Sequence, residues 1–276
     1  MSSLSAKRAV PEPATGELID SHCHLDMEPY RDAPARILAE ASHCGVRQII
    51  SIGIDSASSS AAVHLAGQYP GVYATIGFHP HNAEEVNEES LRQLAKLAQA
   101  DKVVAYGEIG LDYAKKYAEP KVQQRAFSRQ LELAIELNLP VVIHDRDAHA
   151  DTARLIKAAG HLVKGGVMHC FSGDRAFAEE MIGLGFMLSI PGVVTFKNAA
   201  PLHDVVRAVS LEHFILETDG PFLAPVPYRG KANHPAYLIH TAQKVADLKD
   251  LSLEEVARQT TANSRRLFNL PTLHTV

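Results

Sequence analysis

Short runs of apolar, β-branched residues alternate along the chain with longer stretches whose apolar residues recur every three or four positions. The longer stretches predict helices, as at residues 120–138, where Phe127, Leu131 and Ala134 share one face. Two last helices are predicted at residues 235–248 and 253–268. The short runs predict eight β-strands, at residues 18–24, 46–54, 72–79, 103–109, 141–145, 166–171, 186–190 and 214–219.

This alternation of strands and helices predicts an α/β protein. Strands that are apolar along their whole length are typical of a parallel sheet covered by helices, because the crossover between parallel strands needs about a dozen residues. Eight such units favour a TIM (β/α)8 barrel. A doubly wound open sheet is the alternative, but no Gly-rich dinucleotide-binding turn follows the first predicted strand.

Length and composition indicate a single domain. The chain has 276 residues, 46% of them hydrophobic, which suits one barrel and predicts a single domain over residues 18–276. Residues 1–17 contain Pro11 and Pro13 and lack the apolar core of a signal peptide, so we expect a flexible leader. No apolar run is long enough for a membrane span, and three cysteines without paired spacing are typical of a reducing compartment. We therefore expect a soluble, cytoplasmic protein.

Histidines and carboxylates gather at the carboxyl ends of the predicted strands, where barrels of this kind place their active sites. Side chains alternate along a strand, so two histidines separated by one residue share a face, while Cys23 and Cys170 are predicted to face away as buried apolar residues. Six of the eight strands end in residues able to bind a metal: His22 with His24, His79, Glu108, His144, His169 and Asp219.

Burying two carboxylates and several imidazoles without partners is costly, and bound cations remove that cost. The donors outnumber the three or four that one tetrahedral ion uses, and a carboxylate can bridge two ions. Nitrogen-rich ligation favours Zn, Mn or Co over Mg, although geometry and availability can override that preference, so all four remain candidates. The sequence thus predicts two divalent metal ions, with the following ligands: His22, His24 and Asp219 around one ion, His144 and His169 around the other, and Glu108 shared.

Six ordered blocks of the sequence resemble those of the TatD family of metal-dependent deoxyribonucleases. The blocks are HCHLD at 22–26, GFHPH at 77–81, GEIGLDY at 107–113, PVVIH at 140–144, MHCFSG at 168–173, and ETD at 217–219 with RG at 229–230 and NHP at 233–235. The resemblance extends from about residue 19 to 269 and implies the barrel, the metal-ligand roles and a phosphodiester substrate. One departure is Gly220, where the family usually has serine.

With a phosphodiester substrate, a metal-activated water is expected to attack phosphorus. Asp219 is the candidate general base, and Glu108 positions the metals and can assist. Loops after the third and eighth predicted strands offer further polar side chains for gripping phosphate oxygens. The candidates for substrate binding are His79, His81, Arg229 and Asn233.

The charge balance limits the form of nucleic acid. With 27 Lys and Arg against 32 Asp and Glu, the net charge is -5, and no general basic field can hold long duplex DNA. We expect DNA as single strands or ends, with RNA as a further substrate, and the resemblance implies a 3′-5′ exonuclease. Four aromatic residues near strand ends are candidates for stacking a base: Tyr113, Phe171, Phe196 and Phe222.

Two other functions stay open on the same evidence. One is a different hydrolase on the same metal site, cleaving an ester or amide such as a D-aminoacyl-tRNA bond or a small phosphoester, because barrel rims accommodate many chemistries. The other is a non-catalytic interaction protein that retains metals for stability.

Overall fold

The computed structural model describes residues 16–115, 117–160 and 164–273. Most of the predicted leader lies outside these residues. Of its last two positions, Glu17 is held by the barrel, since its carboxylate accepts a hydrogen bond of 2.6 Å from Arg265. Within the described ranges, none of the helices combines the length and hydrophobicity needed to cross a membrane.

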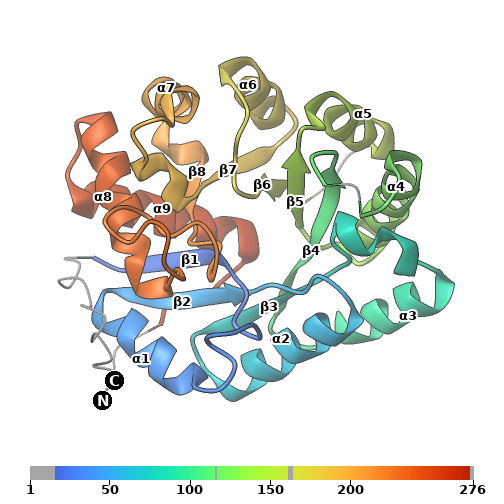
Figure 1. Ribbon diagram of the computed structural model, residues 1–276. Coiled ribbons are helices and arrows are strands. Elements are labelled where there is room, and N and C mark those ends of the chain that lie inside the picture. Colours follow the sequence, from blue (N-terminus) through green and yellow to red (C-terminus); the bar gives the residue numbers. More distant parts are fainter. Residues whose placement is uncertain (1–15, 116, 161–163, 274–276) are drawn as a thin grey trace, which may run out of the picture.

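Eight parallel strands form one sheet in chain order, so that each strand pairs with the next along the sequence (Figure 1). The ring closes where the ends of the first and last strands meet: His24 N donates to Gly220 O (2.8 Å), and Asp219 N donates to His22 O (2.9 Å). The predicted TIM (β/α)8 barrel is confirmed. The strands are β1 Leu18–Cys23, β2 Val46–Ser51, β3 Val72–Ile76, β4 Val103–Asp112, β5 Val141–Arg146, β6 Gly166–Met168, β7 Phe186–Ile190 and β8 Phe214–Leu216.

Helices cover the outside of the barrel (Figure 1). Several begin where the sequence supplies a cap: Asp55 and Asn87 form capping boxes ahead of the second and third helices, and proline opens the fourth. The helices are α1 Pro34–His43, α2 Ser56–Gln68, α3 Glu88–Leu97, α4 Pro120–Glu136, α5 His149–Ala159, α6 Arg175–Gly183, α7 Ala200–Ala208, α8 Leu238–Lys249 and α9 Leu253–Phe268. Short 3-10 turns lie at η1 Pro80–Glu85, η2 Gly192–Thr195, η3 Leu211–His213 and η4 Pro235–Tyr237.

Two hydrophobic cores fix the barrel. The outer core lies between the sheet and the helices and includes Leu18 of β1 and Val141 of β5. The inner core receives the next residue of each of these strands, Ile19 and Val142, and Phe268 of α9 packs into it. Because both faces of each strand are buried, the strands are mostly apolar, and the polar side chains at the carboxyl rim stand out.

Several strands end earlier than the alternation predicts. β3 stops at Ile76, β6 at Met168 and β8 at Leu216, whereas β4 continues to Asp112. Beyond the shorter strands the regular ladder is interrupted: Thr218 N donates to the carboxylate of Asp20 at 2.9 Å, whereas His169 N still donates to the backbone oxygen of Ile143. Some donors at the rim therefore belong to loops, and the alternation of strand side chains does not apply to them.

Candidate metal centre

All six predicted metal ligands converge at the carboxyl rim of the barrel, around Glu108 at the middle of β4. One of its carboxylate oxygens lies 3.4 Å from His22 Nε2 and 4.0 Å from His24 Nε2. The other oxygen lies 2.7 Å from His144 Nδ1 and 3.5 Å from His169 Nε2. Side chains at the ends of three other strands, β1, β5 and β6, thus surround one carboxylate.

Asp219 closes the other side of the cluster. Its Oδ1 lies 3.8 Å from His22 Nε2, 3.6 Å from His24 Nε2 and 4.0 Å from His169 Nε2. The left-handed backbone conformation of Asp219, with φ 55°, turns this side chain back over the end of β1. The sequence separates the two sides by almost 200 residues, and barrel closure between β1 and β8 brings them together.

The donors fit divalent cations. His22 is only 1% exposed, yet neither of its ring nitrogens has a hydrogen-bond partner among the described residues, and neither does Nδ1 of His24. Leaving buried imidazole nitrogens unpaired is costly, and a cation that receives the lone pair of one nitrogen of each ring offsets that cost. Donor atoms from His22, His24 and Asp219 lie within 4.8 Å of one another, as do those of His79, Glu108 and His144.

Two histidines are placed differently from the expected division of ligands. His79, predicted to bind substrate, lies in the cluster, with Nε2 3.6 Å from Glu108. His169, predicted to join His144, instead stacks on His22 with 3.5 Å between ring centroids and lies between the two groups of donors. Donor atoms of His22, Glu108 and His169 also lie within 4.8 Å of one another, so His169 can bind a cation together with either group.

The prediction for Cys170 is wrong. Its sulfur lies within 4.8 Å of donor atoms of His169 and Asp219, at the site instead of behind it. β6 ends at Met168, and Cys170 has a left-handed φ of 47°, so the alternation of strand side chains no longer applies. Cys23, still within β1, is fully buried in the outer core as predicted.

Buried carboxylates behind the ligands hold them in place. Glu217 accepts from His169 Nδ1 (3.0 Å) and from the backbone N–H of Cys170 (2.8 Å). Asp20 accepts from the hydroxyl of Thr218 at 2.6 Å, which anchors the segment that carries Asp219 to β1. A carboxylate on the second nitrogen of a ligand histidine fixes its orientation and tautomer.

Asp112 is a third such carboxylate. It is buried at the end of β4 and lies 2.9 Å from His81 Nε2 and 3.3 Å from His144 Nε2. Sequence reasoning missed Asp20, Asp112 and Glu217. The sequence could have identified them, because each is an acidic residue inside or beside an apolar strand and close to a predicted ligand, where exposure to solvent is not expected.

Electrostatics of the metal-free cluster follow from burial and from the carboxylates. Burial lowers the pKa of His79 to about 3. Burial also lowers the pKa of His144, but hydrogen bonds to Asp112 and Glu108 outweigh it and raise the pKa to about 9. For His169 the charges of Glu217 and Glu108 outweigh burial in the same way, and the pKa rises to about 10. At pH 7 these two imidazoles are therefore protonated when no cation is bound.

Cation binding is expected to release protons. His144 and His169 must lose their protons before they can donate to a metal, so at pH 7 about two protons should leave per protein. Their raised pKa values stabilise the metal-free fold below about pH 6.5, and this contribution is lost as pH rises towards 9 and 10, where metal affinity increases. Titration calorimetry in buffers of different ionisation enthalpy measures the number released.

His149→Gln provides the control for this titration. His149 also has a raised pKa, because of its hydrogen bond to Asp145, but it lies outside the donor cluster. This variant should release as many protons as the wild type, whereas His144→Asn should release about one fewer. Metal binding without proton release would contradict the assignment of His144 and His169 as ligands.

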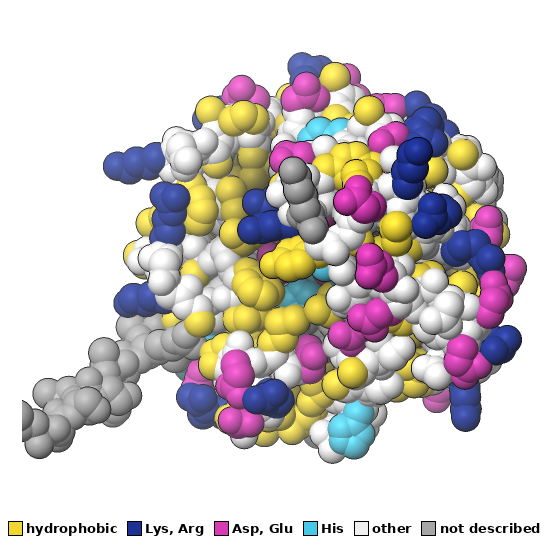
Figure 2. Space-filling model, turned by 45° about the vertical axis from the view of Figure 1, so that its right-hand side comes forward, with side chains coloured by type: hydrophobic (Ala, Val, Ile, Leu, Met, Phe, Trp, Pro, Cys, Tyr) yellow, Lys and Arg dark blue, Asp and Glu magenta, His cyan; other side chains and the backbone are white. Residues whose placement is uncertain are grey.

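The cluster forms the floor of a cavity of about 450 Å³. Figure 2 shows histidine at the bottom of a hollow whose rim carries hydrophobic side chains. Arg146, which sequence reasoning missed, also lines the cavity, is exposed, and has no carboxylate at ion-pair distance in the described part of the chain. Its position two residues after His144 was the available signal. Phe222, 49% exposed, and Leu223 form an apolar wall.

The remaining substrate-binding candidates fall in different places. His81 lines the cavity and is bonded to Asp112. Arg229 lies outside the cavity lining, with its guanidinium 4.3 Å above the Phe196 ring. Asn233 is fully buried, and its amide donates to backbone oxygens of Thr218 (2.6 Å) and Phe222 (2.7 Å). The structure thus brings His81 to the mouth, whereas Asn233 fastens the loop after β8.

The four aromatic candidates also separate. Phe222 lines the cavity, with its ring centroid 5.8 Å from that of His24. Phe171 is buried, Tyr113 is half-buried, and Phe196 lies beneath a guanidinium. Of these four, Phe222 has the position needed to meet a base.

Gly220 makes room for a tyrosine. A Cβ at Gly220 would lie 2.5 Å from the Tyr30 hydroxyl and 3.2 Å from Cys23 Sγ. That hydroxyl donates to the backbone oxygen of Asn233 at 2.8 Å, so it is held in place. The serine usual in the resembling family would collide with Tyr30 here, and the glycine is the counterpart of this tyrosine.

A parallel barrel with histidines and carboxylates converging at its carboxyl rim is the arrangement of a metal-dependent hydrolase. The family model described as TatD related DNase matches residues 19–269, and the chain belongs to this family. The resemblance read from the sequence blocks is therefore confirmed.

Individual relatives agree. The uncharacterized metal-dependent hydrolase YabD of Bacillus subtilis (strain 168) is 40% identical over 253 residues, covering 92% of this chain and 99% of that protein. A protein of Erwinia tasmaniensis named 3′-5′ ssDNA/RNA exonuclease TatD is 35% identical over 241 residues, covering 85% and 93%. The crystal structure of YJJV, a TatD homolog from Escherichia coli K12, superposes with a TM-score of 0.88 at 32% identity, covering 92% and 98%.

Proposed function

We propose that this protein is a deoxyribonuclease that removes nucleotides from single-stranded or terminal DNA in the 3′-5′ direction, and that it also accepts RNA. The name of the Erwinia tasmaniensis relative and the family description support this substrate class. The observation that carries the proposal is the cluster itself: Glu108 and Asp219 among five imidazoles at the floor of a cavity open to solvent. We infer that residues 18–276 act as one hydrolase domain.

Two divalent cations, of Mg, Mn, Zn or Co, are proposed at the two groups of donors. Bound there, they supply Lewis-acid chemistry, which lowers the pKa of a water and neutralises charge that develops on phosphorus and the leaving oxygen. Glu108 belongs to the second group, also lies 3.4 Å from His22 of the first group, and keeps the imidazoles in place. The three cysteines are free, in keeping with the reducing, cytoplasmic setting that we propose.

Asp219 is proposed as the general base. The surrounding imidazoles outweigh the effect of burial and hold the pKa of Asp219 below its ordinary value, so the carboxylate is ionised at neutral pH. It borders the cavity and can accept a proton from the attacking water. Arg146 and His81 are placed to bind phosphate oxygens, and Phe222 with Leu223 offers an apolar wall to a base.

Labelled oligonucleotides test this function. Protein stripped of metal and reloaded with Mg, Mn, Co or Zn should shorten a 5′-labelled single strand one nucleotide at a time, and a panel of carboxylic esters, amides and aminoacyl-tRNA serves as comparison.

Arg146→Ala should lower kcat/KM for the strand about tenfold to 100-fold, because a charged hydrogen bond to phosphate is lost.

Three further results test the substrate-binding candidates and separate the nuclease from the two other functions. Arg229→Ala, which removes an exposed cation outside the cavity lining, tests the weaker of the two arginine candidates. Turnover of the ester panel with no ladder for any ion would favour a different hydrolase. Absence of turnover on every substrate would leave a metal-stabilised interaction protein.

A further inference from the structure

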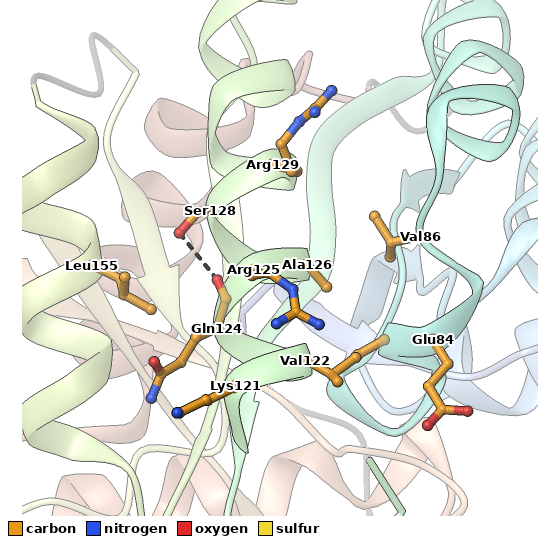
Figure 3. A pocket seen from close by; sticks show the side chains of 11 residues that line it. Glu84, Val86, Lys121, Val122, Gln124, Arg125, Ala126, Ser128, Arg129 and Leu155 are labelled. Atoms are coloured by element: carbon orange, nitrogen blue, oxygen red, sulfur yellow. Dashed lines mark hydrogen bonds between the residues drawn. The ribbon is translucent and has the colours of Figure 1, made fainter. Parts of the chain in front are cut away.

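A second concave surface lies on the outer wall of the barrel, next to the metal-centre cavity. It is an open groove of about 830 Å³ along α4, with the η1 segment on one side and Leu155 of α5 at its edge (Figure 3). The η1 segment separates the two sites: His81 and Asn82 line the cavity, whereas Ala83 and Glu84 line the groove. The groove therefore begins at the rim of the metal-centre cavity.

The lining of this groove is positively charged. Three cations, Lys121, Arg125 and Arg129, line it together with one carboxylate, that of Glu84. Figure 3 shows Arg125 extending from α4 towards the segment that carries Glu84. For a chain with a net charge of -5, this is a local basic surface of the kind that a polyanion requires.

Two of these cations are available to a ligand. Lys121 and Arg125 are exposed, one helical turn apart on α4, and across the described ranges neither has a carboxylate at ion-pair distance. Several other helix-surface arginines are paired, as Arg92 is with Glu89 at 2.6 Å. Arg129 is also paired, since it bonds to a glutamate of α3 at 2.6 Å. Lys121 and Arg125 can therefore bind phosphates without breaking an existing ion pair.

The floor of the groove is apolar, because Ala83, Val86, Val122 and Ala126 line it. Ala83, Ala118 and Ala126 form a small buried cluster, and Val86 and Val122 pack against it. The members that line the groove come from η1 with the residue after it and from α4, so apolar side chains from both sides of the groove meet in this cluster. Small apolar side chains beside cations suit a ligand that has both flat apolar rings and phosphates.

An exposed aromatic ring stands where the cavity meets the groove. Tyr117 is 67% exposed, the largest value among the exposed large hydrophobic residues of the described chain. Its ring centroid lies 4.5 Å from that of His81, and the next residue, Ala118, packs with Ala83 and Ala126, which line the groove. A tyrosine exposed in this way offers a face on which an unpaired base can stack.

We propose that the groove beside α4 is an extended binding site for the part of a single-stranded nucleic acid that lies outside the metal-centre cavity. Tyr117 stacks a base at the rim, and Lys121 and Arg125 bind successive phosphates. The apolar floor favours a single strand over a duplex, because base pairing hides the ring faces and edges that such a surface contacts. This inference rests on the proposed nuclease function and adds the path of the substrate.

Binding of strands of different length tests this path. Fluorescence anisotropy is measured on the metal-loaded wild type with phosphorothioate strands of 3 and 15 nucleotides, which resist cleavage. The double variant Lys121→Ala/Arg125→Ala should bind the 15-mer about tenfold more weakly and lower the slope of log affinity against log salt by about 1.4, since each phosphate contact of a single strand contributes about 0.7. Its affinity for the 3-mer should change by less than about twofold.

Tyr117 and a charge-matched control complete the experiment. Tyr117→Ala should weaken 15-mer binding about fivefold or more, and Tyr117→Trp should restore it, because stacking needs a ring and not a hydroxyl. Lys96→Ala/Arg258→Ala removes the same charge from exposed positions on α3 and α9 and should bind both strands as the wild type does.

The outcomes separate this inference from the nuclease proposal. A wild type that cuts strands, with a groove variant that behaves like the control, overturns the groove site alone. If polyglutamate displaced the 15-mer from the wild type as well as an unlabelled strand does, the groove would be a general anion surface, and this result would also overturn the proposed groove site. A wild type that neither binds nor cuts any strand removes the nuclease function, and the groove site with it.

Discussion

Glu108→Gln is expected to lower kcat about 10³-fold or more and to remove most of the bound metal. Glu108 has oxygens within 4.0 Å of five imidazoles, more than any other carboxylate of the cluster has. Glutamine has the same shape but no charge, so the imidazoles and cations would share a site with a single remaining carboxylate, Asp219. Metal content by mass spectrometry and steady-state kinetics measure both effects.

The loss of charge also predicts a change in protonation. Glu108 contributes to the raised pKa values of His144 and His169, so these should fall in Glu108→Gln, and residual metal binding should release fewer protons. Glu136→Gln, an exposed glutamate at the end of α4, removes the same charge away from the site and should match the wild type. A Glu108→Gln protein with full metal content and full activity would show that this carboxylate is not the shared ligand.

The barrel could be predicted because successive residues of its strands are buried on both faces of the sheet. Leu18 and Val141 face the outer core, and the residues after them, Ile19 and Val142, face the inner core. Burial of both faces makes each strand mostly apolar, which distinguishes it from the amphipathic helices around it. Any polar residue at such a strand end is then conspicuous, and this is how the six candidate ligands were selected.

The limits of the prediction lie one or two residues beyond the strands. Alternation places side chains correctly while the backbone is extended, as for Cys23 in β1. It fails at Cys170, where the backbone turns left-handed, and it says nothing of His79, which lies beyond the end of β3 and was assigned to substrate although it lies in the donor cluster. Loop geometry depends on long-range hydrogen bonds that no local pattern records.

The roles of the supporting carboxylates also could not be assigned from the sequence, because their partners lie far away along the chain. Asp20 bonds to Thr218, 198 residues away, and Glu217 bonds to His169, 48 residues away. Each pair becomes visible only once the barrel is closed. These bonds hold the ligands before a cation arrives, so the fold positions the site at the cost of burying several ionised groups.

Asp219→Asn is expected to lower kcat by about 10² to 10⁴-fold while KM for the strand changes little, because asparagine cannot accept the proton of the attacking water. The other five ligands keep the cluster together, so metal content should fall less than in Glu108→Gln. The wild-type rate should decline towards acid pH, where Asp219 and the ligand histidines gain protons. Rates of single-turnover cleavage across pH measure this decline.

The pH profile separates a general base from a simple ligand. If Asp219 accepts the proton, the residual activity of Asp219→Asn should lose part of this acid dependence, and raising the metal concentration should not restore the rate. If Asp219 acts only by holding a cation, saturating metal should bring the rate back. Asp147→Asn removes a carboxylate from an exposed position after β5, where the left-handed backbone suits asparagine, and should leave the profile unchanged.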